Sequence, residues 1–112
     1  MGKGRHLAEF ELLLLLAVMR MGEEGYGAAL RREIEQRTGR PVSIGAVYAT
    51  LDRLERKGWV SSSERDATAR RAGRARRYFQ LEPAGAAAVL EAKRVLEQMW
   101  EDVELDATPE GA

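Results

Sequence analysis

The chain contains no cysteine and only one histidine, His6. Without thiols it can form neither disulfides nor thiolate metal sites. Its longest unbroken apolar run, residues 12–19, has eight residues and is too short to span a bilayer. Glu9 and Glu11 interrupt the apolar part of the N-terminus, so no signal-peptide pattern is present. These absences predict a cytoplasmic protein without a membrane segment.

Side chains suited to catalysis are also scarce. The one histidine lies close to residue 1, and no nucleophile and base can be paired in the sequence. No group of residues has the spacing of metal ligands, and the glycines at residues 22–27 lack the lysine and the preceding strand of a phosphate-binding loop. The sequence therefore predicts a protein that is not an enzyme and that uses no metal or cofactor.

The composition indicates one compact domain, with 112 residues of which 45% are hydrophobic and 32% charged. The formal net charge is zero, but residues 91–110 hold seven acidic side chains while arginine dominates residues 64–77. The arginines of that segment are Arg65, Arg70, Arg71, Arg74, Arg76 and Arg77. Because association with phosphate depends on the local field, this segment is a candidate contact for nucleic acid, with a solvated loop as the alternative.

Helical periodicity predicts a first helix at residues 7–21. Residues 12–19 are apolar on every side, so this helix should be buried on every side, and a second subunit is the expected cover. A second helix is expected at residues 26–37. Gly39 and Pro41 end it, because glycine accepts a left-handed cap and proline cannot extend a helix.

A third helix is expected at residues 43–57, with Ser43 as its N-cap and Gly58 after its end. Two helices joined by a short turn, the second of them well capped, are typical of a helix-turn-helix motif. The residues expected to face inward from the third helix are Ile44, Val47, Leu51 and Leu54.

Residues 59–64 and 76–81 are expected to form two antiparallel strands, and the long polar loop between them is typical of a wing. Pro83 favours the start of a last helix, expected to reach residue 105. Its coiled-coil seam consists of Val89, Ala92, Leu96, Met99 and Val103. The predicted fold is mainly α with a two-stranded β wing. It comprises a winged helix-turn-helix DNA-binding domain at residues 1–82, a dimerisation helix at 83–105 and a flexible tail at 106–112.

The outward face of the third helix carries small side chains, which let a backbone approach base edges in a major groove. Its first N–H groups lie at the positive end of the helix dipole, where a phosphate can bind. An ordinary surface helix is the alternative interpretation. The residues expected to contact DNA from this helix are Ser43, Gly45, Ala46, Tyr48, Ala49, Thr50 and Arg53.

Arg74, Arg76 and Arg77 lie where the loop returns to the second strand. Their planar, permanently charged guanidinium groups suit contact with phosphates or a minor groove. Trp100 on the last helix is expected in core or dimer packing, with a cavity for a flat aromatic ligand as the alternative. The residues expected at the dimer or ligand site are Phe10, Leu14, Leu96, Met99, Trp100 and Val103.

Taken in order, these segments resemble the PadR family of transcriptional regulators over residues 7–90. The likeness rests on residues 10–16, Tyr26-Gly27, residues 43–60, the wing at 73–81 and residues 83–85. The resemblance implies a homodimeric winged-helix repressor that binds a partly palindromic operator and dimerises through its first and last helices. Some members of the small subgroup bind flat aromatic drugs between tryptophans at the dimer interface, and Trp100 falls in a comparable stretch.

The expected function is therefore sequence-specific DNA binding by a homodimer that regulates transcription. The helix at residues 43–57 would enter the major groove, and the wing at residues 65–77 would lie on the backbone or the minor groove. A winged-helix module that senses a ligand or binds another protein, without binding DNA, is the alternative function.

Overall fold

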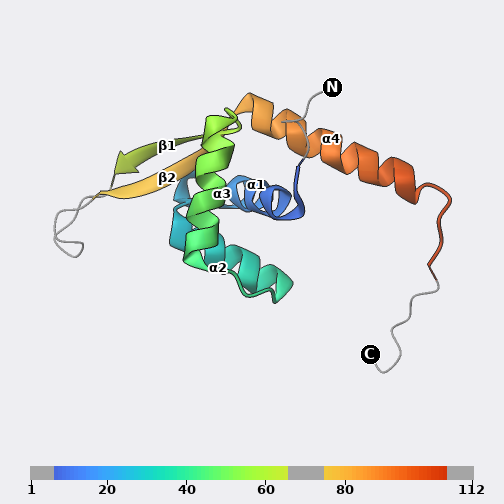
Figure 1. The fold of residues 1–112 in the computed structure, drawn as a ribbon, viewed down its shortest axis with the longest axis horizontal. Coiled ribbons are helices and arrows are strands. Elements are labelled where there is room, and N and C mark those ends of the chain that lie inside the picture. Colours follow the sequence, from blue (N-terminus) through green and yellow to red (C-terminus); the bar gives the residue numbers. More distant parts are fainter. Residues whose placement is uncertain (1–6, 66–74, 106–112) are drawn as a thin grey trace.

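The computed structural model describes residues 7–65 and 75–105 of the chain. Helices α1 to α3 form a body from which a β hairpin and a long last helix, α4, extend in opposite directions (Figure 1). The elements in order are α1 (Glu9–Met21), η2 (Gly22–Glu24), α2 (Gly27–Thr38), α3 (Ile44–Arg56), β1 (Val60–Arg65), β2 (Arg76–Leu81) and α4 (Pro83–Trp100). The mainly helical fold with a two-stranded antiparallel sheet confirms the predicted fold class.

Helix α1 lies at the centre of the body, where α2, α3 and α4 all contact it. Its Leu14 and Leu15 side chains are fully buried in the core. Leu16 and Met19 are exposed on the opposite side, so a single chain does not bury this helix on every side. Helix α4 contacts α1 without covering this side, so the expected burial of this helix by a second subunit stays a prediction.

The turn between α2 and α3 is fixed by polar contacts with α2 and α1. Gly39 ends α2 with φ of 71°, the left-handed conformation expected of a glycine cap. The Glu35 carboxylate then accepts a hydrogen bond from the Val42 N–H at 3.0 Å. Arg40 pairs with Glu9 of α1 at 2.8 Å. These contacts set where α3 begins.

Helix α3 begins as predicted, because Ser43 Oγ accepts a hydrogen bond from the Ala46 N–H at 3.0 Å. Its inner face consists of Val47, Leu51 and Leu54, all fully buried. Ile44 was expected on this face but is 41% exposed, since the first residue of α3 extends past the edge of the core.

The hairpin pairs Val60 with Leu81 at its base and Arg65 with Arg76 at its outer end. Phe79 is fully buried, and its N–H donates to the Gly25 carbonyl at 2.8 Å. This bond ties the hairpin to the segment that enters α2. The wing strands lie within one residue of their predicted bounds.

Helix α4 begins at Pro83 as predicted but ends at Trp100, five residues before the expected end at residue 105. The chain leaves the helix because Asp102 adopts a left-handed φ of 62°. Only the start of α4 packs on the body, where Val89 is buried. The expected tail at residues 106–112 lies outside the described residues.

The start of α4 lies very close to Trp59, the residue before strand β1. A Cβ atom placed on Gly85 would lie 2.2 Å from the Trp59 carbonyl oxygen and 2.9 Å from Leu81 Cδ1. The Glu82 N–H also donates to that carbonyl at 2.9 Å, and Ser61 Oγ donates to the Glu82 carboxylate at 2.6 Å. Residue 85 therefore needs to be glycine for this docking geometry.

We expect Gly85→Ala to lower the free energy of unfolding by about 1–3 kcal/mol, because its methyl group would meet a backbone oxygen that cannot move freely. Chemical denaturation of the two proteins measures the change. Gly45→Ala is the matched control, since a Cβ there meets nothing within 4 Å. Equal stability of Gly85→Ala and the natural protein would contradict the close approach.

Candidate nucleic-acid interface

The outer face of α3 is uncovered. In Figure 1 this helix lies in front of the body, and Ser43, Gly45, Ala46 and Ala49 are all exposed. A Cβ atom on Gly45 would have open space around it. A flat object such as the edge of a base pair can therefore approach the backbone of α3 closely. The predicted outward orientation of Gly45, Ala46 and Ala49 is confirmed.

Tyr48 lies at the flank of α3, as expected, and it is half-buried. Its ring occupies the space beside Gly27, where a Cβ atom would lie 2.4 Å from the hydroxyl oxygen. The ring also lies 6.5 Å from that of Phe79. The Tyr26-Gly27 pair at the start of α2 thus has a packing role, because residue 27 must leave room for the tyrosine of α3.

Thr50 and Arg53 were both expected to face outward or to the flanks of α3, and only Thr50 differs from this prediction. Thr50 is only 3% exposed, because it lies three residues after Val47 and shares its buried face. Its hydroxyl accepts a hydrogen bond from Arg53 Nη2 at 3.2 Å. Thr50 therefore cannot contact a base edge in this conformation, whereas Arg53 remains about half exposed at the edge of the outer face.

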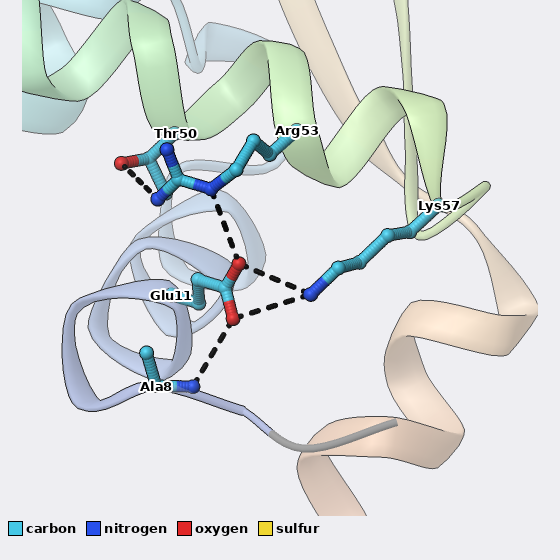
Figure 2. A network of polar contacts seen from close by, with 5 residues as sticks. All are labelled: Ala8, Glu11, Thr50, Arg53 and Lys57. Carbon is cyan, nitrogen blue, oxygen red and sulfur yellow. Dashed lines mark hydrogen bonds and ion pairs between the residues drawn. The ribbon is translucent and has the colours of Figure 1, made fainter. Parts of the chain in front are cut away.

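The carboxylate of Glu11 lies beneath this edge and joins α1 to α3 (Figure 2). Although it is charged, Glu11 is 5% exposed. It accepts hydrogen bonds from the Ala8 N–H at 3.1 Å and from Lys57 Nζ at 3.1 Å, and it forms an ion pair with Arg53 Nε at 3.6 Å. The predictions from the sequence missed this residue.

Burial by itself raises the pKa of the Glu11 carboxyl, because it disfavours the charged form. The Ala8 N–H, Lys57 and Arg53 outweigh that effect, and the net pKa is lowered from its ordinary value. Glu11 is therefore ionised in the folded protein at neutral pH, with two cations of α3 beside it. Lys57 itself lies over the Trp59 ring at 4.6 Å, which helps to fix its position.

Arg77 does not extend toward solvent as the wing prediction requires. Its guanidinium donates to Asp52 at 3.3 Å, to Glu55 and to Ser62 Oγ at 3.2 Å, and it lies 4.9 Å from the Phe79 ring centre. The cause is the strand register, which turns residue 77 toward α3 and residue 76 away from it. Arg77 thus braces the hairpin against α3, and its expected role as a DNA contact is not supported by this geometry.

The two arginines of the outermost pair of the hairpin, Arg65 and Arg76, lie on tyrosine rings. Arg76 lies 4.0 Å from the centre of the Tyr26 ring, and Arg65 lies 3.9 Å from that of Tyr78. A hydrogen bond from Arg32 is the largest cause of a lowered pKa of the Tyr26 phenol, and the charge of Arg76 adds to it. The charges of Arg32 and Arg76 thus lie beside the Tyr26 ring. Arg74, the other predicted wing contact, lies outside the described residues.

The residues expected at a dimer or ligand site divide into two groups. Leu14 is fully buried in the core of its own chain, so its assignment to that site is wrong. Phe10 is half-buried against the core. The four others are exposed on the far half of α4 and beyond it: Leu96, Met99, Trp100 and Val103.

One further cation on α3, Arg56, was also missed. It is exposed and forms no ion pair within the described residues. The sequence could have indicated this residue, because Arg56 lies three residues after Arg53 and seven after Ala49, and this spacing places side chains on the same helix face.

No helix in the described part of the chain is long and apolar enough to cross a membrane. The same residues contain no cluster of side chains suited to a metal ion.

A capped helix with a bare outer face beside an antiparallel hairpin defines a winged helix-turn-helix protein. Residues 15–91 match the model of the Transcriptional regulator PadR-like family, and this match covers more than half of the chain. The chain therefore belongs to the PadR-like family of transcriptional regulators. Membership implies DNA binding and a regulatory rather than an enzymatic role.

Known relatives agree with this assignment. The transcriptional regulator Rv3488 of Mycobacterium tuberculosis is 42% identical over 80 residues, which cover 71% of this chain and 70% of that protein. The structure of H. salinarum RosR aligns with a TM-score of 0.71 and 27% identity, covering 91% of this chain and 84% of RosR. A PadR family regulator from Clostridium difficile, 19% identical, shares the fold with a TM-score of 0.65 over 82% of this chain and 95% of its own.

We expect Glu11→Gln to lower the free energy of unfolding at pH 7 by about 1–2 kcal/mol, because the partly exposed Lys57 and Arg53 would lose a charged partner. The folded-state pKa of Glu11 is lowered, so its stabilising effect is present above the unfolded value near 4.5 and is lost as the pH falls through the folded value. Urea denaturation of both proteins at pH 7 and pH 3 measures the difference. An equal difference at the two pH values would show that ionised Glu11 does not stabilise the fold.

Proposed function

We propose that this protein regulates transcription as a homodimer that places α3 of each subunit in successive major grooves of a pseudo-palindromic operator. The observation that carries this proposal is the uncovered outer face of α3, where small side chains leave the backbone accessible. The contact set for base edges and nearby phosphates is Ser43, Gly45, Ala46, Ala49, Arg53 and Arg56. Two such helices about 34 Å apart match one turn of the duplex.

The wing is the second contact in this proposal. Arg65 and Arg76 lie at the outer end of the hairpin, and Arg74 adjoins it in sequence. Guanidinium groups there can neutralise phosphates on either side of a groove, which contributes affinity without reading the sequence. Arg77 braces the hairpin in this scheme, so the wing and α3 reach the duplex as one unit.

The homodimer is inferred from apolar side chains that a single chain leaves in water. The seam of α4 exposes Leu96 and Met99, and the uncovered side of α1 exposes Leu16 and Met19. A second copy that packs against these surfaces would bury them, which is the usual reason for such patches. Symmetric pairing would also place two α3 helices on one side of the molecule, as a palindromic site requires.

We expect Met99→Glu to shift the dimer toward monomer by at least tenfold in the dissociation constant, because it would bury a charge in an apolar seam. Met99 is 73% exposed in the single chain, so the fold should be retained. Sedimentation equilibrium measures the change. Gln98→Glu adds the same charge outside the seam and should leave the dissociation constant unchanged, so equal behaviour of the two variants would argue against dimerisation through α4.

We further propose that the operator overlaps a promoter, so that bound protein represses, and that a flat aromatic compound releases it. Trp100 supports the second part, because its indole is 52% exposed on the helix assigned to the dimer interface. An exposed indole offers a planar ring a stacking surface. The described residues show a shallow hollow between Met19 and Gln80, away from Trp100, so a site at the tryptophan would need the second copy.

We expect Ala49→Glu to lower operator affinity by at least tenfold, because a carboxylate on the outer face of α3 would repel phosphates and block close approach. The operator is first obtained by selecting fragments bound from genomic DNA at a stated salt concentration, and affinity is then measured by gel shift. Ala87→Glu on the exposed side of α4 makes the same change away from α3. Equal affinity of the two variants would remove α3 from the interface.

A further inference from the structure

We propose that Glu11, which is too deeply buried to contact DNA itself, is a positioning residue that holds the Arg53 guanidinium at the edge of the outer face of α3. This inference rests on the proposed function, because it assigns a task to Arg53 in DNA recognition. The observation behind it is a buried carboxylate on α1 whose charge is directed at two cations of α3.

Two groups fix the orientation of the Arg53 guanidinium, the Glu11 carboxylate of α1 and the Thr50 hydroxyl of α3 (Figure 2). Its Nε faces Glu11 Oε2 at 3.6 Å, and its Nη2 donates to the buried Thr50 hydroxyl at 3.2 Å. The Nη1 donors make no hydrogen bond within the described part of the chain, and the side chain is about half exposed. The guanidinium is thus anchored along one edge and presents the other edge to an approaching ligand.

A guanidinium held in this way suits recognition of a phosphate or a guanine edge. Bidentate contacts need the planar fork at one orientation, and a long side chain otherwise loses its rotamer freedom when it binds. The contacts with Glu11 and Thr50 already restrict the rotamers of Arg53 when the protein folds, so this freedom is not lost again on DNA binding. Arg56, one turn further along α3, has no such anchor among the described residues and provides an internal comparison.

Lys57 keeps the carboxylate from repelling DNA. It donates to both oxygens of Glu11, at 3.1 and 3.4 Å, so two cations surround one anion and the cluster is positive overall. Because of this charge balance, two explanations predict opposite changes in DNA affinity when Glu11 is replaced by glutamine. Simple electrostatics predicts that Glu11→Gln would strengthen binding to any duplex, because a negative charge is lost. Positioning predicts weaker binding to the operator alone.

The test is a double-mutant cycle with Glu11→Gln, Arg53→Ala and the double variant, measured on the operator and on an unrelated duplex of equal length. We expect Glu11→Gln to weaken operator binding by about fivefold, the scale of one immobilised side chain, while binding to the unrelated duplex is unchanged or stronger. In the Arg53→Ala background, Glu11→Gln should have no further effect on the operator.

Two controls separate positioning from a general effect on the fold. Lys57→Met weakens the link between α1 and α3 without touching Arg53, so it should leave the ratio of operator to unrelated binding unchanged. Thr50→Val removes the other anchor of Arg53 at similar volume and should lower that ratio, even if Glu11→Gln proves too unstable to measure.

The inference is overturned if Glu11→Gln weakens operator binding equally with and without Arg53, or if it strengthens binding to both duplexes. A second measurement needs no DNA. The Arg53 Nε–H signal in nuclear magnetic resonance spectra should exchange more slowly with water in the natural protein than in Glu11→Gln. If the signal is the same in both proteins, the positioning role of Glu11 is refuted, but the proposed DNA binding is not. If exchange is slow but the protein binds no duplex, the proposed function is refuted.

Discussion

The arrangement of the fold depends on α3 packing against the rest of the protein through one face only. Val47, Leu51 and Leu54 bury its inner face, and the opposite face must stay bare if a duplex is to reach it. Burial of apolar surface is not directional, so it fixes the depth of the helix better than its rotation. The ionised carboxylate of Glu11 supplies direction, because it attracts Lys57 and Arg53 on the same flank of α3. A buried charge thus complements the core in defining the exposed face.

Several of the cations in this chain are engaged within the protein. Arg77 connects β2 to the carboxylates of α3, Lys57 and Arg53 share Glu11, and Arg76 lies on the Tyr26 ring. Their charges still contribute to the field around the duplex, but their side chains also maintain the geometry of the hairpin and α3. The number of arginines in a segment therefore overstates how many extend freely toward phosphate.

Most of the fold could be predicted from the sequence, because apolar periodicity, Ser43, Gly39 and Pro83 are local signals that the structure obeys. The errors arose where tertiary contacts decide the outcome. Thr50 is polar by type but buried by position, and the strand register turned Arg77 toward α3. Glu11 was missed because its partners lie more than forty residues along the chain. No pattern in one sequence connects two such segments. The side chains on the outer face of α3 were predictable, since helix spacing alone assigns them.

The close docking of Gly85 on the Trp59 carbonyl has a mechanical consequence. Helix α4 has 18 residues, so it is about 27 Å long at 1.5 Å per residue, and most of that length extends away from the body. A tilt of about 10° at its base would displace its far end by about 5 Å. In a dimer joined through the far ends of α4, the distance between the two α3 helices would vary with the same angle. In the proposed dimer, the absence of a methyl group at residue 85 would therefore influence the spacing between half-sites.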